Sequence, residues 1–142
     1  MPVINPNAPY QDSFHKPLDD EQEKLGNKVV NAAYQVYKEL GPGLLEKVYE
    51  ACFCYELRKA GIQFVRQAKV PIVYDSLEFD EGLRLDVLIE DSIIVEIKSV
   101  ENSHPVWEAQ IISYLKLTEN RLGFLINFNV PYFKRGIKRI IV

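Results

Sequence analysis

Three charged residues in the middle of the chain have types and a spacing that suit metal-assisted chemistry. Asp86 is followed after nine residues by Glu96, and Lys98 comes two positions later. Carboxylate oxygens are the ligands that Mg²⁺ and Mn²⁺ prefer. A cation held by two carboxylates activates water and stabilises growing negative charge, and an adjacent ammonium adds a fixed positive charge. The three residues are therefore candidates for a metal site that activates water for hydrolysis.

The segments that carry these residues predict a β-hairpin. Residues 83–89 and 93–99 have strand composition and are separated by a short polar turn. With that turn centred on Asp91, Asp86 faces Glu96 across the two strands, and Arg84 faces Lys98. Because side chains alternate along a strand, one face carries four charged residues, namely Arg84, Asp86, Glu96 and Lys98. The opposite face carries an apolar set, namely Leu85, Val87, Ile89, Ile93, Val95 and Ile97.

The two facing carboxylates carry an electrostatic cost. Like charges directly opposite each other on neighbouring strands repel. Arg84 and Lys98 offset part of this repulsion, and a hard divalent cation offsets more of it. The hairpin alone leaves two interpretations open: a metal site, or a solvated face on which the four charged residues form salt bridges. Without its neighbours in the sequence, the solvated face is favoured.

The rest of the chain predicts one α/β domain of the α+β-like kind. Apolar periodicity and helix-ending glycines give helices over residues 19–40, 45–60 and 102–118. Further strands are expected over residues 64–67, 70–74, 122–128 and 137–142, with a polar turn over residues 75–82. These elements form a single domain with a mixed central β-sheet flanked by helices. Residues 1–18, which hold three prolines before residue 10, predict an extended, weakly ordered arm, so the folded domain spans residues 19–142.

Four motifs together resemble the PD-(D/E)XK nuclease superfamily. Asp86 with Glu96-Ile97-Lys98 matches the D…(D/E)xK signature, and Gly82-x-Arg84-x-Asp86 is similar to the strand that introduces the first aspartate. The stretch from Gln110 to Tyr114 is similar to the QxxxY motif of the RecB-like and lambda-exonuclease-like branch. The stretch from Gly43 through Glu46 to Tyr49 is similar to the GxxExxY motif, which names a group of small bacterial proteins. The resemblance covers about residues 20–142, and Leu85 stands where the signature often has proline.

The resemblance implies a restriction-endonuclease-like core with a divalent-metal site. Asp86 and Glu96 would ligate Mg²⁺ or Mn²⁺, with the Ile97 backbone carbonyl as an additional ligand. Glu46 would reach the same metal or its water shell. Lys98 would orient or activate the attacking water and stabilise the developing charge.

The same resemblance implies that the third helix lines the site through Gln110 and Tyr114. It also implies that the substrate is nucleic acid, with DNA favoured. Neither histidine nor cysteine is needed as a nucleophile in this chemistry, which agrees with their absence near the motif.

Each flanking residue also has a simpler interpretation. Glu46 alone is typical of a first-turn residue that complements the helix dipole. Tyr49 fits either a core aromatic or a hydrogen-bonding partner. Gln110 and Tyr114 are one helical turn apart, so they equally fit a packing stripe. Trp107 fits a core anchor, which is favoured, or a platform on which a base stacks.

A basic cluster near the end of the chain is the other candidate for contact with nucleic acid. It consists of Lys134, Arg135, Lys138 and Arg139. The cluster fits a solvated edge-strand face and a phosphate-contacting patch equally well. Arg84 on the hairpin is a further candidate contact.

Composition narrows the class of protein. A net charge of −3 and a pI near 5.4 count against a protein that grips many phosphates non-specifically, although a bound cation reverses the local sign. Cys52 and Cys54 fall on different helix faces, and neither histidine has a ligand-spaced partner, so neither a disulfide nor a zinc site is expected. The first residues lack the features of a secretory signal, and no apolar run is long enough to span a membrane. We therefore expect a cytoplasmic protein with no membrane partner.

Three functions are consistent with these observations. The leading one is a metal-dependent nuclease. The alternative is a catalytically silent nuclease-fold module that binds nucleic acid or a protein partner, which the small size and acidic pI favour. The third is a structural or assembly subunit whose charged hairpin is merely solvated. Since one domain of 142 residues offers limited surface to a duplex, we also expect a homodimer.

Overall fold

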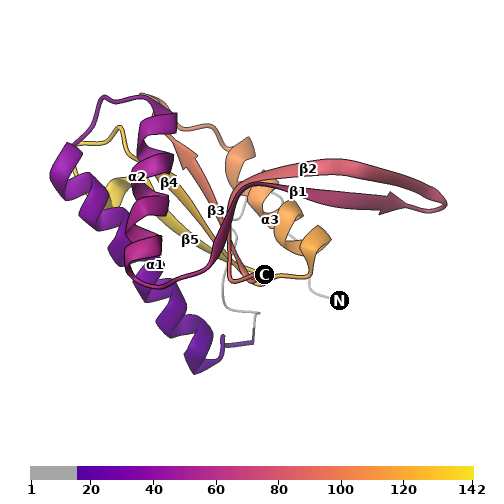
Figure 1. Cartoon of the computed structure of the whole chain (residues 1–142). Helices are drawn as coiled ribbons and strands as arrows, with labels where there is room; N and C mark the ends of the chain where they lie inside the picture. Colours follow the sequence, from indigo (N-terminus) through magenta and orange to yellow (C-terminus); the bar gives the residue numbers. More distant parts are fainter. Residues whose placement is uncertain (1–15) are drawn as a thin grey trace.

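A five-stranded mixed sheet forms the centre of the molecule, in the strand order β1-β2-β3-β4-β5 (Figure 1). The computed structural model describes residues 16–142. Strands β3 and β4 are parallel, and the other neighbours are antiparallel. The elements are α1 (Asp20–Leu40), α2 (Glu46–Lys59), β1 (Phe64–Tyr74), β2 (Leu77–Ile89), β3 (Ile93–Lys98), α3 (Val106–Thr118), β4 (Leu122–Asn127), α4 (Phe133–Gly136) and β5 (Ile137–Ile141).

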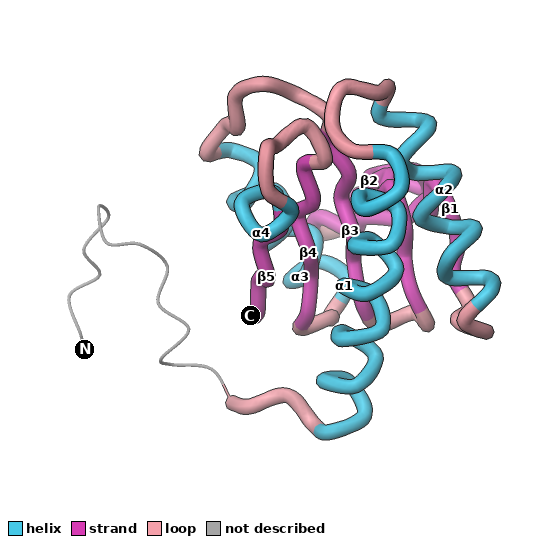
Figure 2. The backbone as a smooth tube through the Cα atoms, turned by 90° about the vertical axis from the view of Figure 1, so that its left-hand side faces the viewer, coloured by secondary structure: helices cyan, strands magenta, loops and turns pink. Residues whose placement is uncertain are grey.

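The helices cover both faces of this sheet (Figure 2). Helices α1 and α2 pack on one face, where Val29, Phe53 and Ile97 belong to the larger core cluster. Helix α3 packs on the other face, where Ile111 and Leu115 belong to a smaller one. Strand β3 is buried on both faces because it lies between these two layers. The predicted mixed sheet flanked by helices is therefore confirmed.

Strands β1 and β2 continue beyond the sheet as a two-stranded arm that projects from the body (Figure 1). The predicted turn over residues 75–82 is wrong, because β2 begins at Leu77. The predicted gap over residues 68–69 is wrong as well, because β1 is continuous and runs through Pro71 at the edge of the sheet. The pairing register shifts between Val70 and Ile72, and this irregularity accommodates a residue that cannot donate to the ladder.

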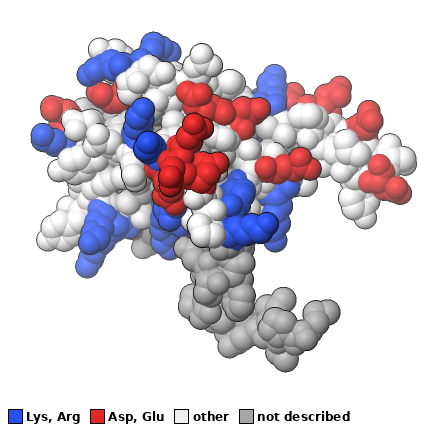
Figure 3. Space-filling view, turned by 90° about the horizontal axis from the view of Figure 1, so that it is seen from below, with Lys and Arg blue, Asp and Glu red and all other residues white. Residues whose placement is uncertain are grey.

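The arm is acidic and partly apolar on its surface. Its exposed apolar side chains are Val73, Tyr74, Leu77 and Phe79. Its acidic side chains are Asp75, Glu78, Asp80 and Glu81, and Figure 3 shows such residues over the projecting arm. Gly82 allows the two strands of the arm to approach closely, because a Cβ atom there would lie 2.4 Å from Cγ1 of Ile72.

The hairpin register agrees with the sequence near the turn. Val87 pairs with Val95 and Ile89 with Ile93, as the turn centred on Asp91 predicted. Leu85 was expected to share one apolar face with Val87, and this prediction is wrong. Leu85 belongs to the core cluster on the α3 side of the sheet, whereas Val87 belongs to the cluster on the side of α1 and α2.

The reason lies where β2 leaves the sheet for the arm. The pairing of β1 with β2 skips Gln67 and Asp86, and Gln67 has a φ of +49°. The expected pairing of Arg84 with Lys98 is likewise wrong. Arg84 pairs with Lys69 on the arm, and its guanidinium donates to Glu81 at 3.0 Å. Asp86 therefore marks the point at which the sheet becomes the arm.

Helix α1 packs tightly on the sheet and begins at a capped residue. A Cβ atom at Gly26 would lie 3.1 Å from Cδ2 of Leu122, so close packing on β4 explains this glycine. The Asp19 side chain accepts a hydrogen bond from the Gln22 amide at 2.8 Å and caps the helix. Of the arm predicted over residues 1–18, residues 1–15 lie outside the described part of the chain. In the remainder, Leu18 is buried, and Arg121 donates to the Lys16 and Pro17 carbonyls.

The helices also bear on two expectations from composition. Within residues 16–142, no helix combines the length and the apolar character that a membrane crossing requires. Both cysteines of α2 are free thiols, with Cys54 buried and Cys52 half-buried.

A glycine that β4 crowds should be intolerant of a side chain. A Cβ atom at Gly136 would lie 2.0 Å from the Asn127 carbonyl oxygen, so Gly136→Ala should lower the free energy of unfolding by more than about 2 kcal/mol. Gly61→Ala is the matched control. That residue has a φ of +75° but open space around it, and the expected cost is about 1 kcal/mol. Urea denaturation measures both, and equal losses would contradict the predicted crowding.

Candidate metal and hydrolysis site

Asp86 and Glu96 lie side by side and hold each other through the backbone. The Asp86 Oδ2 atom accepts a hydrogen bond from the Ile97 amide at 2.8 Å. The Glu96 Oε1 atom accepts one from the Asp86 amide at 3.3 Å. The sequence expected these two residues to face each other, and the structure brings them together where β2 leaves the sheet.

Burial makes this pair electrostatically costly. Glu96 is only 8% exposed to solvent. Its burial, followed by the negative charge of Asp86, raises the pKa of Glu96 to about 9. Lys98 lowers that pKa, but it is a lesser cause than the first two. Near neutral pH and without a cation, the pair therefore keeps a proton and carries about one negative charge instead of two.

Glu46, the first residue of α2, reaches the same region. Burial is the main cause that raises the pKa of Glu46, and the charge of Asp86 is the second. Both residues line a pocket of about 230 Å³, together with Lys47, Glu50, Gln67 and Ile97. Within residues 16–142, no three His, Cys, Asp or Glu side chains are grouped closely enough to hold an ion. Glu46 is exposed and lines this pocket without forming a ready-made ligand group with the other carboxylates.

The oxygen donors in this pocket, together with the adjacent Glu96 carboxylate, nevertheless fit a divalent cation. Two adjacent carboxylates and a main-chain carbonyl at Ile97 are hard oxygen donors. Burial, and next the negative charge of Asp86, raise the pKa of Glu96, so the ionised form of this carboxyl group is disfavoured without added positive charge. A cation at this position would supply the charge that the retained proton now supplies.

Tyr49 fixes the loop that leads into Glu46. Its ring is fully buried and stacks on Phe128, with ring centroids 4.5 Å apart. Its hydroxyl donates to the Gly41 carbonyl at 2.5 Å and accepts from the Leu44 amide at 3.1 Å. Ser99 directly follows β3, and its hydroxyl donates a hydrogen bond to the Leu44 carbonyl at 2.5 Å. Tyr49 is therefore both a core aromatic and a hydrogen-bonding partner.

Lys98, the last residue of β3, is held beside the carboxylate pair. Its Nζ atom lies 5.0 Å from the centre of the Trp107 ring, which is a cation–π distance. Its charge lowers the pKa values of Glu46 and Glu96, so it acts on both groups. Its carbonyl accepts from the Phe128 amide at 3.0 Å, which fixes the backbone against β4.

Helix α3 brings Tyr114 to the pair and leaves Gln110 at the surface. Burial raises the pKa of Tyr114, and the charges of Glu96 and Asp86 raise it further. The phenol is thus within electrostatic reach of both carboxylates. Gln110 is exposed one turn earlier, and its side chain makes no hydrogen bond to residues 16–142.

Glu50, Arg66 and Gln67 take part in the site, but the sequence did not indicate them. Glu50 is 8% exposed and accepts from Arg66 Nη2 at 3.1 Å and from Gln67 Nε2 at 2.7 Å. These bonds tie α2 to the root of the arm, next to Asp86. The one available signal was that Glu50 follows Glu46 by four residues, which places both on one helix face.

Ion pairs occupy much of the predicted basic cluster. Lys138 pairs with Glu108, and Arg139 pairs with Glu23 at 2.5 Å. Arg135 lies over the Tyr132 ring at 5.9 Å, and Lys134 is exposed. A role of these residues, or of Arg84 on the arm, in nucleic-acid binding stays a prediction.

A family model identifies the chain. The model described as PD-(D/E)XK nuclease superfamily matches residues 23–140, and the chain therefore belongs to that superfamily. The match spans all five strands and carries Glu46, Asp86, Glu96 and Lys98 within it. No curated protein and no solved structure gives a significant match.

Because Glu96 binds its proton more tightly in the folded state, stability in a chelator should fall as pH rises. The folded state keeps the proton to about pH 9, while the unfolded chain releases it near the ordinary pKa of a glutamate side chain, 4.5. The folded state binds more protons in this window, so the slope of the unfolding free energy is negative. Its limit is about 1.4 kcal/mol per pH unit for one proton.

The measurement is urea denaturation in EDTA across this window. Glu96→Gln should remove this part of the slope and raise the stability at the upper end. Glu39→Gln, at an exposed position of α1, is the matched control and should behave as the original chain does. Identical pH profiles for the original chain and Glu96→Gln would refute the buried-pair assignment.

Removing the Tyr49 hydroxyl should disturb Glu46 from a distance. Tyr49→Phe keeps the stacking on Phe128 but leaves the Gly41 carbonyl and the Leu44 amide without this partner, at a cost of about 1–3 kcal/mol. Mn²⁺ affinity, measured by calorimetry, should fall with it. Tyr55→Phe is the control, since Tyr55 is 58% exposed on the same helix. A loss of stability without any loss of affinity would show that the loop does not position Glu46.

Proposed function

We propose that this chain hydrolyses phosphodiester bonds of nucleic acid, with DNA as the favoured substrate, in a reaction that depends on Mg²⁺ or Mn²⁺. The observation that carries the proposal is the pairing of buried Glu96 with half-buried Asp86, because a divalent cation would relieve their repulsion. Membership of the PD-(D/E)XK nuclease superfamily supports the same class of activity.

Different residues of the site would bind the cation, orient the attacking water and stabilise the developing charge. Asp86, Glu96 and the Ile97 carbonyl would hold the cation, with Glu46 bound to it through water. The cation would supply Lewis-acid charge to the scissile phosphate and a more acidic bound water. Lys98 would orient the attacking water and stabilise charge on the phosphoryl oxygens. The backbone bonds of Asp86 and Glu96 keep both carboxylates in place without rearrangement.

The polar residues of α3 would complete the wall of the site. Tyr114 is close enough to sense the charges of Glu96 and Asp86, so its hydroxyl can donate to a phosphate or a bound water. Gln110 is exposed on the same helical face and is available to substrate. Both roles follow from the QxxxY resemblance and from the position of α3.

A finer assignment within the superfamily also belongs to this proposal. The contacts of Tyr49 with the loop before Glu46 give the GxxExxY pattern a physical purpose, which supports assignment to the GxxExxY group. The position of Tyr114 supports the RecB-like and lambda-exonuclease-like branch. A cytoplasmic location and a homodimer stay predictions, and the exposed apolar residues of the arm are candidates for the dimer contact.

A second candidate function is a nuclease-fold module that binds without cutting. The observation in its favour is that no three metal-ligating side chains within residues 16–142 are already grouped around one point. Calorimetry separates the two functions. A nuclease should bind Mn²⁺ in a manner that Asp86→Asn abolishes, whereas a silent module should show no such carboxylate-dependent binding.

Purified protein should cleave at least one form of DNA in Mg²⁺ or Mn²⁺, and Lys98→Ala should slow cleavage by about 100-fold or more. The matched control is Lys59→Ala. Its ammonium lies 5.4 Å from the Tyr55 ring centre, much as Lys98 lies over Trp107, but far along α2 from Glu46. Circular dichroism checks that each variant is folded.

Single-stranded and duplex DNA and RNA form the substrate panel. If every substrate survives in both metals, the catalytic proposal is lost. If Mn²⁺ binding through Asp86 is also absent, the binding module is favoured. If Lys98→Ala and Lys59→Ala cut equally well, Lys98 does not have the proposed role.

A further inference from the structure

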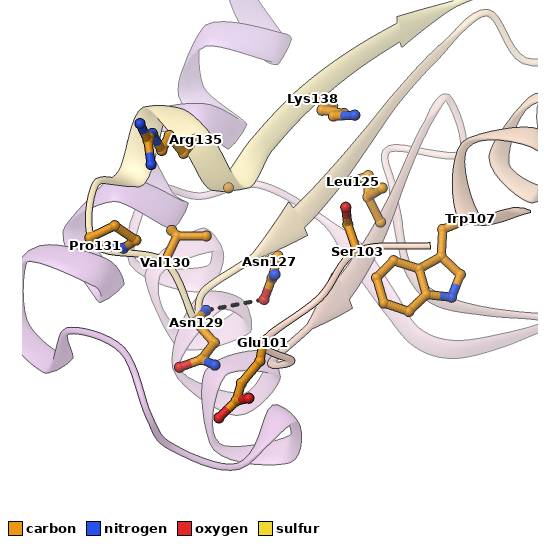
Figure 4. Close-up of a pocket in the computed structure, with 11 residues that line it drawn as sticks. Glu101, Ser103, Trp107, Leu125, Asn127, Asn129, Val130, Pro131, Arg135 and Lys138 are labelled. Carbon is orange, nitrogen blue, oxygen red and sulfur yellow. Dashed lines mark hydrogen bonds between the residues drawn. The ribbon is translucent and has the colours of Figure 1, made fainter. Parts of the chain in front are cut away.

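A second pocket lies beside Lys98, on the α3 side of the strand ends (Figure 4). Its volume is about 300 Å³. It is lined by Glu101, Ser103, Trp107, Leu125, Asn127, Asn129, Val130, Pro131, Arg135, Gly136 and Lys138. None of the carboxylates of the proposed metal site lines it, so this pocket is separate from the one that holds Asp86 and Glu46.

Trp107 connects this pocket to the proposed site of hydrolysis. Its ring lines the pocket, and the Lys98 ammonium lies 5.0 Å from the ring centre. Trp107 is half-buried, so one part of the indole is free to meet a ligand. An aromatic ring next to a cation that faces a phosphate is the arrangement in which a base stacks beside its own phosphodiester.

Polar groups of two kinds stand around the rest of the pocket. Arg135 lies at the end away from Trp107 (Figure 4), and it forms no ion pair with residues 16–142. Between these ends lie Ser103 and Asn129, whose side chains make no hydrogen bonds to the described part of the chain. A guanidinium suits a phosphate, and a free amide and hydroxyl suit the edge of a base.

The inner wall of the pocket is rigid and apolar. Leu125 on β4 is buried, as is Gly136 at the end of α4. The Asn127 side chain is already engaged, since it donates to the Val100 carbonyl at 3.0 Å and accepts from the Val100 and Asn129 amides. Asn127 thus shapes the pocket, while Asn129 and Ser103 remain available to a ligand.

We propose that this pocket binds one unpaired nucleotide next to the phosphodiester that is cut, with its base on Trp107 and a flanking phosphate on Arg135. This inference rests on the proposed function and names its substrate class: nucleic acid that is single-stranded at the cleavage point. A base inside a duplex is stacked on both faces and cannot lie against the indole.

The charge distribution favours the same substrate class. Duplex binding without sequence preference draws its affinity from many cation–phosphate contacts. Five basic side chains of residues 16–142 that could serve are already in ion pairs, namely Arg66, Lys69, Arg84, Lys138 and Arg139. Stacking on an aromatic ring supplies affinity that does not depend on those charges.

The test uses the fluorescence of Trp107, which is the single tryptophan of the chain. In EDTA, where nothing is cut, a short single-stranded oligonucleotide should quench this fluorescence. A duplex of the same sequence and an oligonucleotide of the same length with abasic residues should quench it less. Anisotropy of a labelled single strand measures total binding in parallel.

Variants assign the two ends of the pocket. Trp107→Ala should weaken single-strand binding by about fivefold or more, and Trp107→Phe should restore most of it because a ring remains. Arg135→Ala should weaken binding by a few fold, with a larger effect at low salt. Lys28→Ala, at an exposed position of α1, is the control and should bind as the original chain does. Circular dichroism checks folding.

The outcomes separate this inference from the proposed function. Binding by anisotropy with unchanged Trp107 fluorescence would overturn the nucleotide pocket and leave the nuclease proposal standing. Equal quenching by duplex and single strand would overturn the preference for an unpaired nucleotide. Absence of any oligonucleotide binding would overturn both proposals.

Discussion

The repulsion between the buried Glu96 carboxylate and the half-buried Asp86 carboxylate is the constraint on which the candidate site depends. Asp86 and Glu96 meet because β2 and β3 pair in one register, and Glu96 is buried because β3 lies between two helical layers. A protein core does not tolerate two such charges without compensation. The proton that Glu96 retains, the nearby Lys98 ammonium and the two backbone amides are the compensation that the chain itself provides.

The parts of the site that were predictable from sequence are those fixed by local pattern. A short polar turn and the positions of the charged residues determine the register at Val87 and Val95, because a slip of one residue would put the charges of one strand opposite apolar residues of the other. The path of β2 beyond Asp86 was not predictable. That path depends on the positive φ of Gln67 and on ion pairs of the arm, such as that of Arg84 with Glu81. Features of this kind leave no periodic pattern in the sequence. Residues 77–82 resemble a turn in the sequence because a solvated two-stranded ribbon has no buried face and so lacks the alternation of apolar and polar residues typical of a strand.

Contacts over long sequence separations supply the rest of the site. The Tyr49 ring stacks on Phe128, and the Leu44 carbonyl accepts a hydrogen bond from Ser99. The position of Glu46 therefore depends on three segments that are distant in the chain. The GxxExxY spacing shows that Tyr49 matters but does not show what it contacts. In the same way, the sequence left Trp107 between two interpretations, and its nearness to Lys98 became visible only when α3 was placed against β3.

The acidic arm gives the two sides of the molecule unequal access for a polyanion. A phosphate chain that comes along β1 and β2 meets Asp75, Glu78 and Asp80 before it can reach Asp86. One that comes across α3 meets Lys98 and Arg135. At physiological ionic strength such charges act over about 8 Å, so the arm repels only a strand that runs alongside it. The acidic residues of the arm thereby lie along one approach to Asp86.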